Sequence, residues 1–246
     1  MKAKFGQNFL IDESVAEREI NYANITKKDV VLEIGAGKGI LTKKLAEKAK
    51  KVIAIEIDKK LFDSLHGQVP DNVELIHEDA VEIDFDDLIK FNKIVANLPF
   101  QISSPITFKI LDYDFELAVL IYQKEFADRL IAKPKSKDYS RLTVNTYYKA
   151  KCELLEVVPS TSFKPQPKVD SSIIKLTKRE KPPFLVLDED FFFEFTKKLF
   201  NHRRKKIRNI INSDTKNIPF LDNRVEELTP SQIGGLSNLL YSLNTS

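Results

Sequence analysis

The tetrapeptide Asn97-Leu98-Pro99-Phe100 combines residue types that could act on the exocyclic amine of an adenine. Such an amine is a poor nucleophile because its lone pair is delocalised into the ring. The Asn97 amide oxygen and the Leu98 backbone carbonyl could accept its two N–H groups and stabilise the positive charge that develops on the nitrogen. Pro99 fixes the backbone, and Phe100 offers a ring face to an unstacked base. Taken alone, these residues would also fit a strand that ends in a proline turn beside a core Phe.

A glycine-rich segment supplies a candidate site for a nucleoside cofactor. Gly35, Gly37 and Gly39 follow Glu33, between an apolar stretch and a helical one. Glycines allow a tight turn and a close approach of a ligand to the backbone at a helix N-terminus. The spacing G-x-G-x-G differs from the dinucleotide pattern G-x-G-x-x-G and from the P-loop pattern.

Acidic residues near this segment indicate which nucleoside it could hold. Glu56 lies 21 residues beyond Gly35, where a carboxylate can accept both hydroxyls of a ribose. Asp79 is placed to accept a hydrogen bond from an adenine amine. S-adenosylmethionine fits better than a dinucleotide, because no phosphate has to be neutralised and the acidic Glu33 suits a cationic sulfonium. The alternative is an ordinary tight turn with solvated acids at strand ends.

The elements that must position these residues alternate between strand and helix. Strands are expected over 30–34, 52–57, 73–77, 93–96 and 117–122, and helices over 40–49 and 59–66. This alternation predicts an α/β fold with a parallel sheet and right-handed crossovers. Later strands near 144–149, 154–158 and 172–177 predict antiparallel additions at one edge.

A double proline at Pro182-Pro183 marks the end of the sheet pattern, because proline continues neither a helix nor a central strand. Beyond it only helices are expected, over 189–200, 203–212, 222–228 and 230–240. The sequence therefore predicts two domains, a sheet domain over residues 1–180 and a small helical domain over residues 181–246.

A basic run in the helical part is a candidate phosphate-binding surface. Seven basic residues and no acid lie between Phe195 and Ile211. The alternative is a solvated helix face, which most charge runs are. An RNA substrate would favour phosphate contacts from the following residues: Arg203, Arg204, Lys205, Lys206 and Arg208.

Composition excludes several other classes of protein. The 246 residues carry a net charge of +3 and contain one cysteine and three widely spaced histidines. An intrachain disulfide is therefore impossible, and no metal site is expected. No apolar run approaches the roughly 18 residues that a membrane helix needs, and the N-terminus lacks an apolar signal core. The expectation is a cytoplasmic protein without a membrane partner.

Taken together, these motifs resemble those of the Rossmann-like rRNA adenine N6-methyltransferases that use S-adenosylmethionine, and the resemblance covers nearly the whole chain. It implies a cofactor motif at Gln7-Asn8-Phe9-Leu10, ribose and adenine contacts at Glu56-Ile57 and Asp79-Ala80, and catalysis at Asn97–Phe100. The stretch 163–171 resembles a late motif whose aromatic residue, here Phe163, sandwiches the target base. The implied mechanism is direct in-line methyl transfer without a strong general base.

Two branches of that family differ in substrate. KsgA-type dimethyladenosine transferases modify two adjacent adenosines near the 3′ end of small-subunit rRNA, whereas macrolide-resistance enzymes modify one adenosine of large-subunit rRNA. The stretches 101–105 and 167–171 resemble the first branch. This implies a monomer that acts on small-subunit rRNA within an assembling small ribosomal subunit.

Three other functions remain open from the sequence. They are the large-subunit methyltransferase, a non-catalytic ribosome assembly or RNA-binding factor, and a nicotinamide-dependent dehydrogenase. The intact Asn97–Phe100 motif argues against the second, and the glycine spacing argues against the third.

Overall fold

The computed structural model describes residues 7–211 and 218–245, which form two compact units. The first unit holds the described residues up to 127 together with 151–178. The second holds 128–150 together with the described residues from 179 on. The predicted division into 1–180 and 181–246 misses the insertion of 128–150 in the second unit. That insertion carries α6 (Arg141–Lys149), which packs on α7 (Glu189–Phe200) and α8 (Pro230–Thr245).

The first unit is built on a seven-stranded sheet in the order β4-β3-β2-β5-β6-β9-β7. Strands β2 to β6 pair in parallel, and β9 pairs antiparallel with β6. The central strands are nearly continuous buried apolar runs, as a parallel sheet covered on both faces requires. The predicted α/β, Rossmann-like fold is confirmed. The strands are β2 (Val30–Ile34), β3 (Lys51–Ile55), β4 (Val73–Ile76), β5 (Lys93–Asn97), β6 (Leu117–Gln123), β7 (Ala150–Val158) and β9 (Ser171–Lys178).

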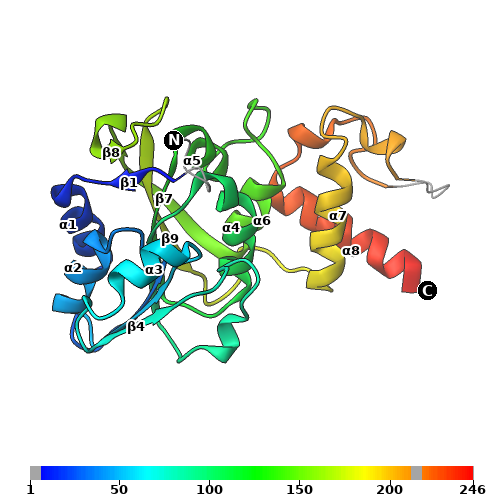
Figure 1. The fold of residues 1–246 in the computed structure, drawn as a ribbon. Helices are drawn as coiled ribbons and strands as arrows, with labels where there is room; N and C mark the ends of the chain where they lie inside the picture. The colour runs from blue at the N-terminus through cyan, green and yellow to red at the C-terminus, as the bar shows by residue number, and fades with distance from the viewer. Residues whose placement is uncertain (1–6, 212–217, 246) are drawn as a thin grey trace. The chain divides into compact units, whose positions relative to one another are not determined.

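Helices of the first unit connect the parallel strands and cover the sheet. The connecting helices are α2 (Ile40–Lys48), α3 (Lys59–Leu65) and α4 (Ser103–Asp112), whereas α1 (Glu13–Tyr22) precedes β2. Helix α5 (Lys124–Leu130) continues from β6 and passes from the first unit into the second after residue 127. Helices α1 and α2 lie side by side (Figure 1). Their apolar faces join buried residues of β2 and β3 in one hydrophobic core.

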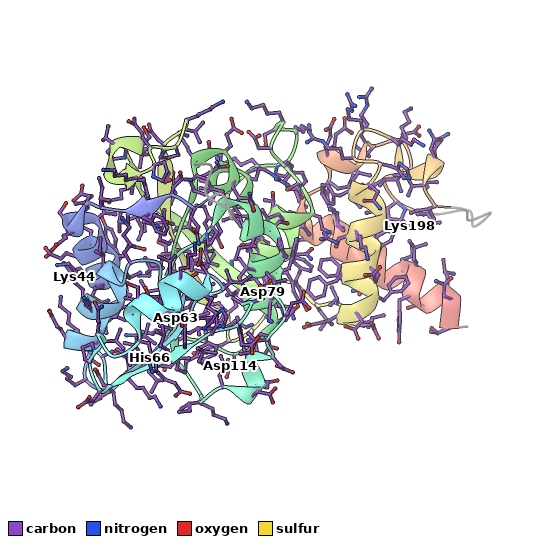
Figure 2. The ribbon with its side chains drawn as sticks, in the orientation of Figure 1. Lys44, Asp63, His66, Asp79, Asp114 and Lys198 are labelled. Carbon is purple, nitrogen blue, oxygen red and sulfur yellow. The ribbon has the colours of Figure 1, made fainter. Side chains whose placement is uncertain are left out.

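The strand order reverses between β2 and β5, and ligands of open α/β sheets bind at such a switch point, outside the carboxyl ends of the strands. The glycine loop lies between β2 and α2, and Asn97 ends β5. Glu56 follows β3 directly, and Asp79, labelled in Figure 2, follows β4. The topology therefore brings the sequence-predicted site residues to one edge of the sheet.

A second, two-stranded sheet joins segments far apart in the chain. Strand β1 (Phe9–Leu10) pairs antiparallel with β8 (Phe163–Lys164), and Leu10 lies opposite Phe163. This pairing fixes the N-terminal segment against the first unit.

The second unit has an aromatic core formed by α6, α7 and the residues before α7. Tyr148, Phe184, Phe192 and Phe193 make mutual ring contacts with centroids 5.2–5.7 Å apart. Helix α8 packs against α7 and α6. Across residues 7–211 and 218–245, no helix is long and apolar enough to cross a membrane.

The strand predicted over 144–149 is wrong, because these residues belong to α6. The β-branched and aromatic residues of this stretch favour a strand locally. Tertiary packing overrides that preference, since Val144 and Tyr148 enter the aromatic core of the second unit. The Ser140 N–H also donates to Thr143 Oγ1 at 3.1 Å and caps the helix.

The helices predicted over 203–212 and 222–228 are also wrong within the described residues. Their backbone groups pair with each other instead, because the Ile207 N–H donates to the Asn223 carbonyl and the Val225 N–H donates to the Lys205 carbonyl. Only single 3-10 turns form, at Ile207–Asn209 and Val225–Glu227. The predicted helix end at residue 212 lies outside the described residues.

Candidate active site

A cavity of about 640 Å³, partly open to solvent, lies at the carboxyl edge of the sheet in the first unit. The cavity unites residues from the N-terminal segment, the glycine loop, the position after β3 and the end of β5 with the residues that follow it. Of the sequence-predicted residues, the following line it: Gln7, Asn8, Leu10, Glu33, Gly35, Gly37, Glu56, Asn97, Leu98, Pro99 and Phe100.

A second cavity of about 500 Å³ adjoins the first, because both are lined by Gln7, Gly35 and Pro99. Its walls are mostly apolar side chains, which suits a flat heterocycle. It takes in three further residues predicted to bind cofactor: Ile57, Asp79 and Ala80.

The carboxylate of Glu56 forms part of the floor of the first cavity and is only 3% exposed. Its Oε2 accepts the Gly37 N–H at 2.7 Å, and its Oε1 accepts the Asp58 N–H at 2.8 Å. Burial raises the pKa of Glu56, and these backbone N–H groups oppose the rise. Each oxygen retains a further lone pair for a ligand hydroxyl. Glu56 thus links the glycine loop to the place where a ribose would lie.

Glu33 brings an unpaired acid to the same cavity. It is 1% exposed, and its Oε2 has no hydrogen-bond partner in the described part of the chain. Burial raises the pKa of Glu33 to about 8, while Thr42 opposes the shift and Glu56 adds to it. Glu19 on α1 is fully buried nearby, and burial together with the charge of Glu33 raises its pKa. A ligand cation in the cavity would supply the partner that Glu33 lacks.

The residues present therefore fit S-adenosylmethionine. The orphaned oxygen of Glu33 suits the cationic sulfonium or amino group of this cofactor, Glu56 suits its ribose, and Asp79 beside an apolar wall suits its adenine. No group of three or more His, Cys, Asp or Glu residues that could hold a metal ion occurs among residues 7–211 and 218–245.

The Asn97–Phe100 segment is held tightly against the glycine loop. Gly35 has a φ of +81°, a backbone conformation that favours glycine, and a Cβ added there would lie in ordinary contact with Pro99 Cδ, at 3.5 Å. Leu98 is buried, and its N–H donates to the Ile121 carbonyl of β6 at 3.3 Å. The Asn97 amide has no hydrogen-bond partner in the described ranges. The Asn97 amide at the rim of the cofactor cavity can therefore form hydrogen bonds with a ligand.

Gly39 does not line either cavity. It precedes α2 with a φ of +77°, and an added Cβ would lie 2.6 Å from Leu65 Cδ2. Its role in this structure is to let α2 begin close to α3, although the sequence groups it with the cofactor-binding glycines.

Phe163 has no exposed ring face in this structure, and its stacking on the target base stays a prediction. Its side chain is 2% exposed and belongs to the hydrophobic core below the sheet edge. It lines neither cavity described above. Its pairing with Leu10 instead supports the strand that carries the N-terminal cofactor motif.

The basic cluster of the second unit divides into paired and unpaired side chains. Arg203 binds Glu226 at 2.9 Å and donates to the carbonyls of residues 136 and 137. Lys206 and Arg208 both pair with Asp222. Only Arg204 and Lys205 of the five predicted residues have no ion pair or side-chain hydrogen bond within the described ranges. These two remain available for phosphate groups.

The sequence assigned no individual role to several residues that line the cavities. Lys38 and Phe9 lie together, with the Lys38 Nζ 5.3 Å from the Phe9 ring centroid, and both line the first cavity. Gln101 and Ile102 line the second. Their positions inside or directly after recognised motifs were the available signal.

The family described as "Ribosomal RNA adenine dimethylase" matches residues 1–232. The chain belongs to this family. A probable ribosomal RNA small subunit methyltransferase A from Methanococcus maripaludis is 49% identical over 258 residues, which cover 97% of this chain and 97% of the relative. The predicted rRNA adenine methyltransferase is thereby confirmed.

Solved structures agree with this assignment. A dimethyladenosine transferase from Plasmodium falciparum has a TM-score of 0.80 and 30% identity, and the match covers 96% of this chain and 98% of that one. The 23S rRNA methyltransferase ErmE has a TM-score of 0.70 and 27% identity, covering 94% and 98%. This rRNA adenine dimethylase is an enzyme with S-adenosylmethionine as its cofactor.

Proposed function

We propose that this enzyme dimethylates N6 of two adjacent adenosines near the 3′ end of small-subunit rRNA, within an assembling small ribosomal subunit. Asn97–Phe100 support this activity most directly, because Asn97 ends β5 and all four residues line the cofactor cavity. The name of the Methanococcus maripaludis relative supports the choice of the small subunit.

The proposed mechanism rests on positioning and electrostatics. When bound, S-adenosylmethionine supplies an electrophilic methyl group on its sulfonium. The Asn97 amide oxygen and the Leu98 carbonyl accept the N–H groups of a flipped adenosine, and Phe100 stacks on its ring. As positive charge develops on the nitrogen, these two oxygens stabilise it. The nitrogen then loses its proton to solvent, so no strong general base is needed.

The cofactor contacts in this proposal follow the cavity walls. Glu56 accepts the ribose hydroxyls, Asp79 accepts the adenine amine, and Glu33 faces the cationic end. The remaining contacts come from the N-terminal segment, the glycine loop and the residues that follow β3 and β4: Gln7, Asn8, Leu10, Gly35, Gly37, Ile57 and Ala80.

The second unit positions RNA in this proposal. Arg204 and Lys205 contact phosphate groups, whereas Arg203, Lys206 and Arg208 mainly hold the loop that presents them. The proposed enzyme works as a monomer in the cytoplasm.

A large-subunit rRNA methyltransferase is the second candidate, because ErmE has a similar fold over 94% of this chain. The test incubates the protein and methyl-labelled S-adenosylmethionine with unmodified small and large ribosomal subunits in separate reactions. Label in small-subunit rRNA supports the proposal, whereas label confined to large-subunit rRNA supports the second candidate. Absence of label in both, although cofactor is bound, would support a non-catalytic RNA-binding factor.

A further inference from the structure

The chain makes a tight turn directly after β4, in the wall of the second cavity. The Asp79 carbonyl accepts the N–H groups of Glu82 at 3.0 Å and Ile83 at 2.9 Å. Asp79 Oδ1 accepts the Val81 N–H at 2.8 Å. One carboxylate oxygen of Asp79 thus stabilises its own turn, which leaves the other oxygen for a ligand. The direction in which this free carboxylate oxygen points depends on the conformation of the turn.

Helix α4 holds this turn through one lysine. Lys109 Nζ donates to the Val81 carbonyl at 2.8 Å and also to the Ile83 carbonyl. The ammonium lies 4.6 Å from the ring centroid of Phe85. Val81 and Ile83 also donate their N–H groups to Asp79. The two residues are therefore bound by Asp79 through their N–H groups and by Lys109 through their carbonyls.

A second side chain of the same helix region secures the residues that follow. The Tyr113 hydroxyl donates to Asp84 Oδ1 at 2.5 Å and accepts the Phe85 N–H at 3.3 Å. Lys109 and Tyr113 are four residues apart, so they lie on one side of α4 and its C-terminal end. Together they hold residues 81–85.

The positive charge of Lys109 lies beside a strongly acidic segment. Residues 78–87 contain six acids and no Lys or Arg. Burial lowers the pKa of Lys109, while the carboxylates of Asp84, Glu82 and Asp79 oppose that shift. A cation from α4 therefore compensates an acidic segment that has none of its own.

Helix α4 also continues directly from the proposed catalytic segment. The Pro99 carbonyl accepts the Ile102 N–H at 3.1 Å in a 3-10 turn over Phe100–Ile102, and α4 begins at Ser103. Gln101 and Ile102 line the same cavity as Asp79. One continuous piece of chain thus reaches both the target-base segment and the turn after β4.

We propose that Lys109 is a positioning residue that fixes the Asp79 turn, so that α4 sets the preference of the enzyme for adenine in its cofactor. The proposal rests on the adenine contact assigned to Asp79 under the proposed function. Lys109 does not touch the cofactor itself, because it acts through the carbonyls of Val81 and Ile83.

The test compares two ligands, S-adenosylhomocysteine and S-inosylhomocysteine, which lacks the 6-amino group. Calorimetry gives the ratio of their dissociation constants for wild type, Lys109→Met and Lys109→Arg. A hydrogen bond to a charged acceptor predicts a wild-type preference for adenine of roughly 10- to 100-fold. In Lys109→Met the ratio falls below about threefold, while affinity for the inosine ligand stays near the wild-type value. Lys109→Arg keeps a cation with N–H donors for both carbonyls and restores part of the ratio.

Two further variants complete the experiment. Lys60→Met removes an exposed lysine of α3 and serves as the control with an unchanged ratio. Tyr113→Phe removes both hydroxyl contacts without a change of charge, and it lowers the ratio partway. It provides a second test if Lys109→Met does not fold.

The outcomes separate the two claims. If wild type shows no preference for adenine, the adenine contact of Asp79 fails and the proposal fails with it. If wild type prefers adenine but Lys109→Met and Tyr113→Phe keep the full ratio, only the role of Lys109 is overturned. Equal weakening of both ligands in these variants would also overturn it, because a purely structural defect does not distinguish an amine from a carbonyl.

Discussion

Replacing Glu56 is the perturbation whose effect can best be calculated from the structure. The buried carboxylate accepts the Gly37 and Asp58 N–H groups and has lone pairs for two ribose hydroxyls. Hydrogen bonds to charged groups contribute about 1.5–3 kcal/mol each. Loss of two such bonds in Glu56→Ala predicts about 3–6 kcal/mol, or roughly 10²- to 10⁴-fold weaker cofactor binding. Glu56→Gln keeps one acceptor oxygen and predicts a loss of roughly 10- to 100-fold.

The assay is calorimetric titration of each variant with S-adenosylhomocysteine at pH 8, where the carboxylate is more fully ionised. Glu47→Ala is the matched control, because Glu47 is an exposed acid of α2 outside the cavity. Circular dichroism confirms that each variant is folded. An unchanged dissociation constant for folded Glu56→Ala would refute the assignment of Glu56 to the ribose. Equal losses of cofactor affinity in the Ala and Gln variants would refute the claim that each carboxylate oxygen binds one hydroxyl.

Three more predictions concern chemistry, protonation and RNA. Asn97→Ala lowers kcat by roughly 10²- to 10³-fold while cofactor affinity stays nearly unchanged, as single-turnover assays and calorimetry can check. Wild-type turnover in that variant would contradict the role of its amide. Because the pKa of Glu33 is about 8 in the free protein, a bound cation must displace a proton below that pH. S-adenosylmethionine affinity therefore rises up to tenfold per unit between pH 6 and 7.5, and a slope that persists in Glu33→Gln would exclude this group. Replacing Arg204 and Lys205 with Ala reduces the salt slope of RNA binding by roughly 1.4–1.8, and an unchanged slope would mean that the two side chains are merely solvated.

The parallel sheet could be predicted because its signals are local. Buried strands such as Val30–Ile34 are continuous apolar runs, and the parallel order then brings their carboxyl ends to one edge. Glu33, Glu56 and Asn97 lie in one cavity for that reason. The position of each residue at or near a strand end was enough to predict that the three lie close together.

Features set by distant partners could not be predicted in the same way. Phe163 stands in a proline-rich stretch that suggests an exposed platform, but its pairing with Leu10 buries it. A helix is predicted over residues 203–212, yet the backbone N–H of Ile207 donates to the Asn223 carbonyl. In both cases the deciding contact comes from a segment that short-range patterns do not reveal.

The basic cluster shows the same limit for charges. Arg203 and Arg204 are adjacent and chemically identical, and sequence alone gives them equal claims on a phosphate. The structure commits Arg203 to Glu226 and leaves Arg204 without an ion pair in the described ranges. The partner, rather than the residue type, decides which cation is available.

The most direct test of the central claim is mass spectrometry of nucleosides from unmodified small ribosomal subunits after reaction with S-adenosylmethionine. Wild type and Asn97→Ala are compared under conditions in which both are saturated with cofactor. The account predicts N6,N6-dimethyladenosine with wild type and little or none with Asn97→Ala. Wild-type amounts of dimethyladenosine from the variant, or methylation of a different nucleoside by wild type, would contradict it.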